Sequence, residues 1–212
     1  MVAGFEIRPA TPEEAPTLAL INRIAFNDVA TWNLLMTDVD PDDVTKLFLA
    51  IAAKRMADGN VTYVSTVDKE TGTILGATAV YVPIKEKDTA LNPEMPAGVN
   101  EKLAAHVFGE ILQETRKYGY DPEKHCHRVG AFILPEYQRK GLGSALSREC
   151  DVIADEVGVD IYVSAYESSL KMFENAGFVR LGHVDTKFGE YGGPNTSFRT
   201  HFLKRYAPAT AS

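Results

Sequence analysis

Residues 127–157 constrain the fold of this chain more than any other stretch. They begin with an apolar run, pass through a short basic loop that contains Gly141 and Gly143, and end in an apolar-periodic segment. That order predicts a strand buried on both faces over 128–134, a tight loop and a helix that ends at Gly158. A helix N-terminus behind such a loop offers unpaired N–H groups and a positive dipole end. The stretch is therefore a candidate phosphate cradle.

Length and composition indicate one globular domain. The chain has 212 residues, of which 45% are apolar and 24% charged, as in soluble proteins. It contains no run of about 18 uncharged apolar residues. Its start lacks the features of a signal peptide, and its two cysteines, Cys126 and Cys150, imply no disulfide framework. We therefore expect a cytoplasmic protein that does not insert into a membrane.

The formal net charge of −7 bears on the partners of the chain. It argues against non-specific nucleic-acid binding, which depends on neutralising phosphates. It is compatible with a cationic substrate such as an amine. Mild acidity is also common among cytosolic enzymes of every kind.

The remaining patterns predict an α/β chain of mixed strand direction. Thr11 with Glu14, and Asp40 with Pro41, are two helix start signals. The valine-, threonine- and tyrosine-rich segments that follow Gly59 form a predicted hairpin. The expected strands are 6–9, 61–67, 73–82, 128–134, 160–165, 178–187 and 196–203, and the expected helices are 11–27, 41–58, 100–118, 142–157 and 168–176.

Residues 83–124 interrupt the sheet pattern. Prolines bracket a charged loop and one helix there, and the segment is too short to bury a core of its own. We interpret it as a helical insertion in a single domain of residues 1–206, followed by a frayed tail at 207–212.

Residues 28–40, between the first two helices, contain the only tryptophan, Trp32. This loop is a candidate wall for a substrate pocket. The alternative is that Trp32 and Leu35 only pack the two helices together. Asp28 could attract a cationic amine, although aspartates near helix ends usually serve as caps.

Two familiar phosphate-binding patterns do not fit the glycine loop. The dinucleotide-binding pattern needs a third glycine, where Leu146 stands, and the phosphate-loop pattern Gly-x4-Gly-Lys-Ser/Thr is absent. Residues 138–143 read Gln-Arg-Lys-Gly-Leu-Gly, follow an apolar strand and are preceded by Pro135. In this form they resemble the acetyl-CoA loop of the GNAT superfamily of N-acetyltransferases.

A second motif supports this resemblance. Residues 172–178, Met-Phe-Glu-Asn-Ala-Gly-Phe, resemble the Leu-Tyr-Glu-x-x-Gly-Phe segment of the family. The order of elements matches over residues 6–203, with 83–123 as the poorest fit, and the chain is similar to fungal-type members that act on small molecules. The resemblance implies the GNAT fold: a mixed, largely antiparallel sheet of about seven strands flanked by about four helices.

The resemblance also implies acetyl-CoA as co-substrate and assigns residues to it. In the family, the strand before the loop splays from its neighbour and pairs with the pantetheine arm through its backbone, at positions that match Ala131 and Ile133. Backbone N–H groups of the loop bind the pyrophosphate, and Arg139 and Lys140 add positive charge. The expected cofactor-binding residues are Ala131, Phe132, Ile133, Leu134, Gln138, Arg139, Lys140, Gly141, Leu142, Gly143, Ser144 and Phe173.

Amine acetylation requires a base, and the resemblance points to His127. Family members commonly carry a carboxylate base eleven residues before the glutamine of the loop, which is the position of His127. A histidine with a reference pKa of about 6.5 is a credible base at neutral pH. The alternative is an exposed strand-end residue. A metal site from His125, Cys126 and His127 is disfavoured because neighbouring strand residues point to opposite faces, so no metal is expected.

The usual acid of the family, the tyrosine of the second motif, is replaced by Phe173. Either CoA leaves as the thiolate or another hydroxyl substitutes, and Tyr166 at the end of the preceding strand is the nearest candidate. Its alternative role is packing beside the cofactor. The departure also leaves open a weakly catalytic module that binds acetyl-CoA.

The acceptor is expected to be a primary amine of a small molecule, acetylated by direct attack in a ternary complex. Asp28, Trp32 and Tyr81 occupy positions that shape the acceptor pocket in this fold. A lysine or N-terminus of a protein or peptide is the runner-up. The insertion could cover the pocket, and a homodimer is compatible with the sequence.

Overall fold

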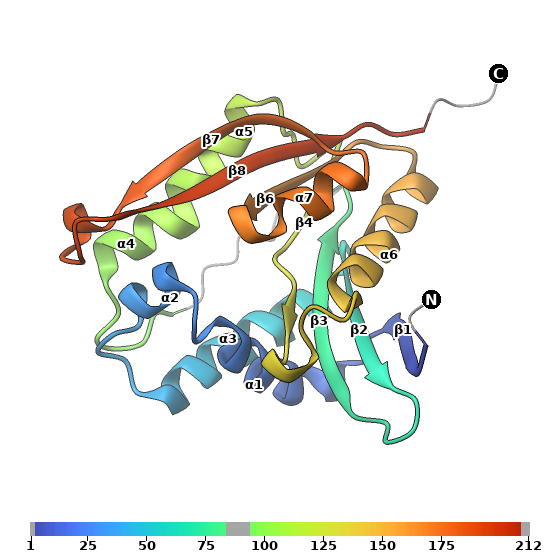
Figure 1. Cartoon of the computed structure of the whole chain (residues 1–212), viewed down its shortest axis with the longest axis horizontal. Coiled ribbons are helices and arrows are strands. Elements are labelled where there is room, and N and C mark those ends of the chain that lie inside the picture. Colours follow the sequence, from blue (N-terminus) through green and yellow to red (C-terminus); the bar gives the residue numbers. More distant parts are fainter. Residues whose placement is uncertain (1–2, 84–93, 209–212) are drawn as a thin grey trace.

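The computed structural model describes residues 3–83 and 94–208, and its sheet is mixed, as predicted. The described strands lie in the order β1–β2–β3–β4–β6–β8–β7, with β5 beside β3 (Figure 1). Every pair is antiparallel except β4 with β6. The bounds are β1 Phe5–Pro9, β2 Val61–Asp68, β3 Ile74–Tyr81, β4 Cys126–Arg128, β5 Phe132–Ile133, β6 Ile161–Tyr166, β7 Val179–Lys187 and β8 Ser197–Arg205.

The two helix start signals act as predicted. The Thr11 N–H donates to Glu14 Oε2 at 2.9 Å, which forms the backbone half of a capping box. The Asp40 carboxylate accepts from the Asp42 N–H at 2.8 Å. The helices are a 3₁₀ turn Pro12–Glu14, α1 Ala15–Phe26, α2 Ala30–Leu35, α3 Pro41–Ala57, α4 Glu101–Ala105, a π-helical turn His106–Glu110, α5 Ile111–Lys117, α6 Leu142–Val157 and α7 Glu167–Asn175.

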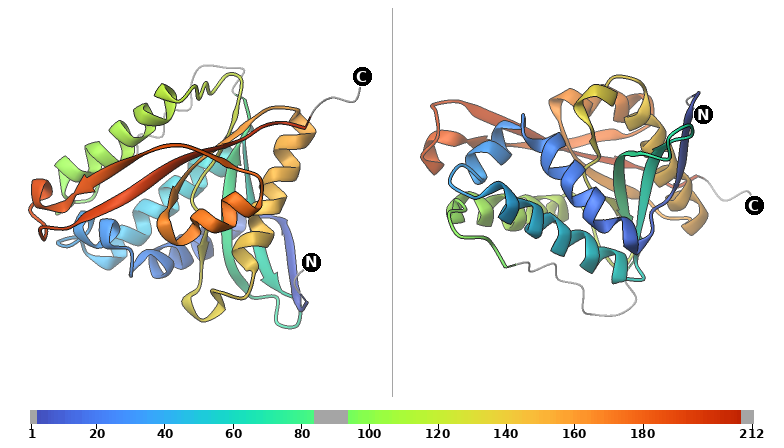
Figure 2. Two further views of the ribbon diagram at one scale, coloured as in Figure 1. Left: turned by 45° about the horizontal axis from the view of Figure 1, so that its top comes forward. Right: turned by 90° about the horizontal axis from the view of Figure 1, so that it is seen from below.

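The helices cover both faces of the sheet (Figures 1 and 2). Helices α6 and α7 pack on one face, where Cys150, Leu170 and Phe178 join a core with β4, β6 and β8. Helices α1 and α3 cover the other face at β2, β3 and β5. The helix formed by α4, the π turn and α5 runs along β7 and β8, so the long hairpin is packed against a helix rather than left free.

Two details differ from the sequence expectations, and two segments lie outside the described residues. Helix α2 lies within the predicted loop 28–40; it is only six residues long, and the burial of Leu35 against Leu103 explains it better than any local signal. Val157, the last residue of the apolar-periodic segment, is 44% exposed, and Ala154 takes the buried place in the last turn of α6. The predicted insertion includes residues 84–93, which lie outside the described residues, as do 209–212 of the predicted frayed tail.

The predicted strand 128–134 is divided in two. Strand β4 pairs with β3 on one side and β6 on the other, whereas β5 pairs with β3 alone. The N–H groups of Val129 and Leu134 donate to Ala79 and Leu75. Between these two hydrogen bonds β3 advances by four residues, from 75 to 79, whereas its partner advances by five, from 129 to 134. The partner strand therefore contains one extra residue, which is a β-bulge. The bulge separates β5 from β6, and this gap agrees with the splayed strands implied by the resemblance.

We expect Gly76→Ala to disturb the pairing of β5 with β3. A Cβ at Gly76 would lie 2.4 Å from the Phe132 carbonyl oxygen and 2.9 Å from Ile133 Cα, so β5 would have to move. Overpacking of this kind should lower the free energy of unfolding by about 1–3 kcal/mol in urea titrations. Gly59→Ala is the matched control, because a Cβ there meets no atom within 4 Å, and it should stay within about 0.5 kcal/mol. Equal stability of the two variants would contradict the tight contact.

Candidate active site

The gap between β5 and β6 exposes backbone groups of β5. Because the Leu134 N–H points to β3, the N–H and C=O of Ile133 point to the opposite side, into the gap. The Ile133 carbonyl accepts a hydrogen bond from Gln138 Nε2 at 3.0 Å. The side chains of Phe132 and Leu134 pack in the core under α1 instead. The backbone of β5 therefore faces the gap in which the resemblance implies the pantetheine arm. The side chains of Phe132 and Leu134 do not face that gap.

The basic loop connects this strand to α6. Arg139 and Gly141 adopt left-handed backbone conformations, with φ of 61° and 84°, and the helix begins at Leu142. A Cβ at Gly143 would lie 3.7 Å from Ile133 and 3.8 Å from Met172, so the start of α6 lies between β5 and α7. The first N–H groups of a helix have no helical acceptor. Those of Gly143 and its neighbours can therefore bind an anion at the entrance of the gap.

Phe173 is not at this surface, contrary to its predicted contact with the cofactor. Its ring is 4% exposed and lies 4.8 Å from the guanidinium carbon of Arg128, on the core side of α7. Arg128 is itself buried and donates to Ser147 Oγ at 2.5 Å. Burial lowers the pKa of Arg128. The ring is drawn inward because it covers this buried cation.

A cavity of about 710 Å³ opens where β6 ends. A Cβ at Gly130, in the bulge, would lie 3.8 Å from the ring of Phe26, which ends α1 two residues before Asp28 of the cavity lining. Two predicted site residues, Asp28 and Tyr166, line the cavity. The full lining is Asp28, Val29, Ala30, Tyr166, Glu167, Ser168, Asp185, Ser197, Phe198 and Arg199.

Tyr166 lies between the gap and the cavity, at the last position of β6. Burial raises the pKa of its hydroxyl, and a hydrogen bond with Trp32 acts in the opposite direction. The hydroxyl is thus protonated at neutral pH and can donate a proton. The ring packs edge-on against Phe198 at 4.6 Å between centroids.

Trp32 and Tyr81, both predicted to bind substrate, are absent from the lining. Trp32 packs between Phe26, Phe48 and Phe108 at centroid distances of 5.4, 5.3 and 5.9 Å. Trp32 also forms a hydrogen bond with Tyr166. Its contacts therefore fit the packing role better than a role in the wall of the pocket. The Tyr81 hydroxyl accepts from Arg55 Nε at 2.9 Å, beneath α3. That bond and its position at the end of β3 hold Tyr81 away from the cavity.

His127 lies deeper in the sheet than the cavity. It pairs with Tyr81 on β3 and Tyr162 on β6, and the cavity begins at Tyr166, four residues or about 13 Å further along. Its Nε2 is buried and has no hydrogen-bond partner among the described residues. Burial lowers the pKa of His127 to about 4, and the charge of Arg55 acts in the same direction. The structure does not bring His127 to the acceptor side, and its role as base stays a prediction.

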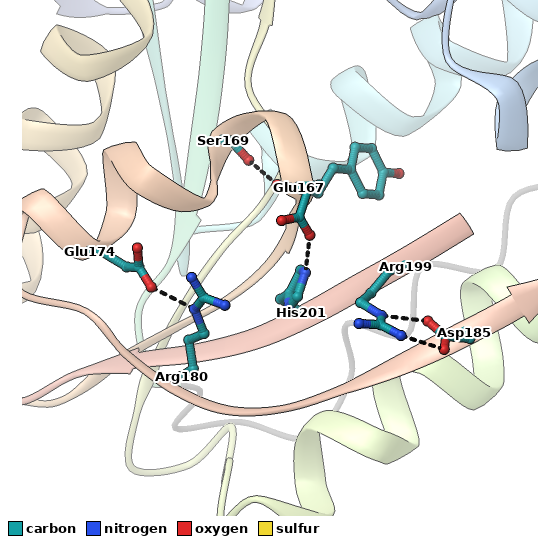
Figure 3. Close-up of polar contacts among 8 residues, drawn as sticks. Glu167, Ser169, Glu174, Arg180, Asp185, Arg199 and His201 are labelled. Carbon is teal, nitrogen blue, oxygen red and sulfur yellow. Dashed lines mark hydrogen bonds and ion pairs between the residues drawn. The ribbon is translucent and has the colours of Figure 1, made fainter. Parts of the chain in front are cut away.

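The sequence analysis did not find Glu167, Asp185 and Arg199, which line the cavity, or His201, which is paired with Glu167 (Figure 3). Arg199 binds both carboxylate oxygens of Asp185, at 2.7 and 2.8 Å, across β8 and β7. His201 Nε2 lies 2.6 Å from Glu167 Oε2 at the start of α7. This hydrogen bond lowers the pKa of Glu167. No motif marks these residues; only their alternation on paired strands could have suggested them.

The structure also bears on the cysteines, on metal ligands and on membrane spans. Both cysteines are free and buried. No group of three histidine, cysteine or acidic residues suited to a metal occurs within residues 3–83 and 94–208. No helix in those ranges has the length and apolar character needed to cross a membrane.

Comparisons with known proteins found a matching family model and solved structures of similar fold. The model of the Acetyltransferase (GNAT) family matches residues 30–178. No curated protein matches the sequence. Among solved structures, the C-terminal condensation domain of Ebony in complex with β-alanyl-dopamine has a TM-score of 0.71 at 14% identity, covering 98% of this chain and 100% of that chain.

Two further structures contain the expected co-substrate. Phosphinothricin acetyltransferase from Sinorhizobium meliloti, in complex with AcCoA, has a TM-score of 0.60 at 16% identity and covers 99% and 92% of the two chains. The acetyltransferase YncA from Salmonella typhimurium, with acetyl-CoA, has a TM-score of 0.60 at 16% identity and covers 99% and 98%. At these identities the likeness shows a shared fold.

The neutral His127, whose Nε2 is buried, should make the free energy of unfolding depend on pH. In the unfolded chain a histidine binds a proton below pH 6.5, whereas folded His127 does so only near pH 4. The free energy of unfolding should therefore fall as the pH drops from 6.5 towards 4, by at most about 3 kcal/mol from this group. Urea unfolding at pH 7 and pH 4.5 measures the difference.

His127→Gln should reduce that difference between the two pH values. His183→Gln, at an exposed position of β7, removes a histidine without touching the buried ring and should leave the difference in place. The same pH dependence in wild type and His127→Gln would contradict the burial of the neutral ring.

Proposed function

The chain belongs to the GNAT acetyltransferase family, and we propose that it transfers the acetyl group of acetyl-CoA to a primary amine of a small molecule. The observation that carries the choice of acceptor is the cavity of about 710 Å³ at the end of β6. Sites for small molecules usually have volumes of about 300–1,000 Å³. A small amine fits this space beside the gap.

The gap and the loop suit the co-substrate. The pantetheine arm would pair with the free N–H of Ile133, whose C=O is bound by Gln138, and the pyrophosphate would bind the N–H groups at the start of α6. Arg139 and Lys140 are exposed at the same end and add positive charge. The thioester would then lie near the bulge at Gly130, close to the cavity.

The cavity suits a cationic acceptor. Asp28, Glu167 and Asp185 contribute carboxylates to its lining, and Arg199 is the cation paired with one of them. Asp28 contacts no cation within the described parts of the chain, so its charge is available to an ammonium group. Coulomb attraction between partly screened charges of this kind amounts to about 1–4 kcal/mol at about 4 Å.

In the reaction, the free amine attacks the thioester carbonyl directly in a ternary complex. The C–N bond forms, the C–S bond breaks, and the amine loses a proton. Tyr166, at the border of the gap and the cavity, would protonate the departing thiolate in place of the tyrosine that Phe173 replaces. This assignment rests on the position of Tyr166 at the end of β6, where it lines the cavity.

Purified protein should release free thiol from acetyl-CoA when a small primary amine is added. The panel should include aromatic amines, because the Ebony domain was solved with β-alanyl-dopamine. It should also include a lysine peptide. Turnover of the peptide alone would favour the runner-up, a protein acetyltransferase. Thermal stabilisation by CoA without any turnover would favour a module that only binds acetyl-CoA.

Tyr166→Phe should lower kcat by about 10²-fold at neutral pH, since it removes the proposed acid and keeps the ring. The KM for the amine should change little. Tyr206→Phe, at an exposed position after β8, is the control and should retain wild-type kcat. A Tyr166→Phe protein with unchanged kcat would mean that CoA leaves as the unassisted thiolate.

A further inference from the structure

Glu167 lines the cavity, and one of its two carboxylate oxygens is bound by a buried histidine. It is the first residue of α7 and lines the cavity beside Tyr166 and Ser168. Its Oε2 lies 2.6 Å from Nε2 of His201, whose side chain is only 6% exposed. Its Oε1 has no hydrogen-bond partner in the part of the chain that the structure describes. A proton acceptor in a cavity needs this combination of one anchored and one accessible oxygen.

The neighbouring acidic groups are less suited to the role. Both oxygens of Asp185 are bound by Arg199, so neither is available to an amine. Asp28 is exposed, and no contact within the described residues fixes its carboxylate. Glu174, on the same helix as Glu167, pairs with Arg180 and does not line the cavity. Figure 3 shows these pairs along α7, β7 and β8.

We propose that Glu167 accepts the proton that the acceptor ammonium loses before it attacks the thioester, with His201 as the residue that positions its carboxylate. The inference rests on the proposed acetylation of an amine. The N–H bond of the ammonium breaks, the proton moves to Glu167 Oε1, and the nitrogen lone pair then forms the C–N bond while the C–S bond breaks. The attacking nitrogen loses its second proton as the amide forms, and Tyr166 protonates the departing sulfur, so that CoA leaves as the thiol and the second proton restores the Tyr166 hydroxyl. The first proton reaches solvent from the exposed carboxylate after product release.

Several charged groups face the pair and set its proton affinity. His183 on β7 lies 6.0 Å from His201 between ring centroids, and the charges of Arg180 and Arg199 lower the pKa of Glu167 together with His201. Asp185 lies on the same face, bound to Arg199. The carboxylate is therefore ionised at neutral pH and ready to accept a proton.

Glu167→Gln tests the proposal, with Glu174→Gln as the matched control. Both changes replace a carboxylate of α7 that is bound to a basic residue of the sheet, and only Glu167 lines the cavity. Glu167→Gln should lower kcat with a small amine by about 10²–10³-fold at pH 7, with an unchanged KM for acetyl-CoA. Glu174→Gln should remain within twofold of wild type.

The basicity of the acceptor separates proton transfer from mere positioning. Two amines of similar shape, one with an ammonium pKa near 10 and one near 7 (about 3 units apart), differ in how much free amine exists at pH 7. The loss in Glu167→Gln should shrink by at least about tenfold with the less basic amine, because that amine needs no base. It should shrink likewise for the basic amine as the pH rises towards 10.

His201 is tested by a conservative pair. His201→Gln keeps an amide donor for Glu167 and should retain more activity than His201→Ala, with the same dependence on amine basicity as Glu167→Gln. Because His201 is buried, the melting temperature of each variant is measured alongside, and kcat is compared only at temperatures where all variants are folded.

The outcomes are distinct. Unchanged kcat in Glu167→Gln, or a loss that is the same for both amines, would overturn the proposal. So would a large loss in His127→Gln without one in Glu167→Gln, which would return the base to the strand position predicted from the sequence. A wild-type protein that binds acetyl-CoA and acetylates no amine would refute the proposed function itself, and the inference with it.

Discussion

The extra residue between Val129 and Leu134 is the constraint on which the site depends. Strand β4 is paired on both sides, and one bulged residue is enough to leave β5 paired with β3 alone. The backbone of Ile133 then faces a gap instead of β6. The same bend directs the chain into the basic loop and α6, so the anion-binding end and the free strand edge are positioned together. The tight contact of Gly76 with β5 holds this arrangement.

Two basic residues of β4, His127 and Arg128, point to opposite faces of the sheet. Arg128 points into the core under α6 and α7, where Ser147 and the face of Phe173 compensate it. His127 points to the opposite face and is neutral because desolvation opposes its protonation. Neither side chain reaches the cavity. The groups that do are on β6, α7 and the β7–β8 hairpin, elements that the bulge has separated from the cofactor strand.

Much of the framework could be predicted from local patterns. The capping signals at Thr11 and Asp40, the hairpin around residues 68–73 and the glycine loop depend on interactions between near neighbours, and each formed where the pattern placed it. The family motifs identified the co-substrate loop for the same reason. The places where the structure departs from the sequence expectations depend on distant partners: α2 requires Leu103, and Tyr81 is held by Arg55 from another element.

The sequence by itself therefore determined the order of elements, the mixed sheet and the phosphate-binding loop, since spacing and backbone preference along the chain are sufficient for them. Only the tertiary structure decided which side chains meet. It buried Phe173 under Arg128, moved His127 out of reach of the cavity and paired Glu167 with His201, residues 34 positions apart. Such contacts follow from strand register and packing between layers, which no local pattern encodes.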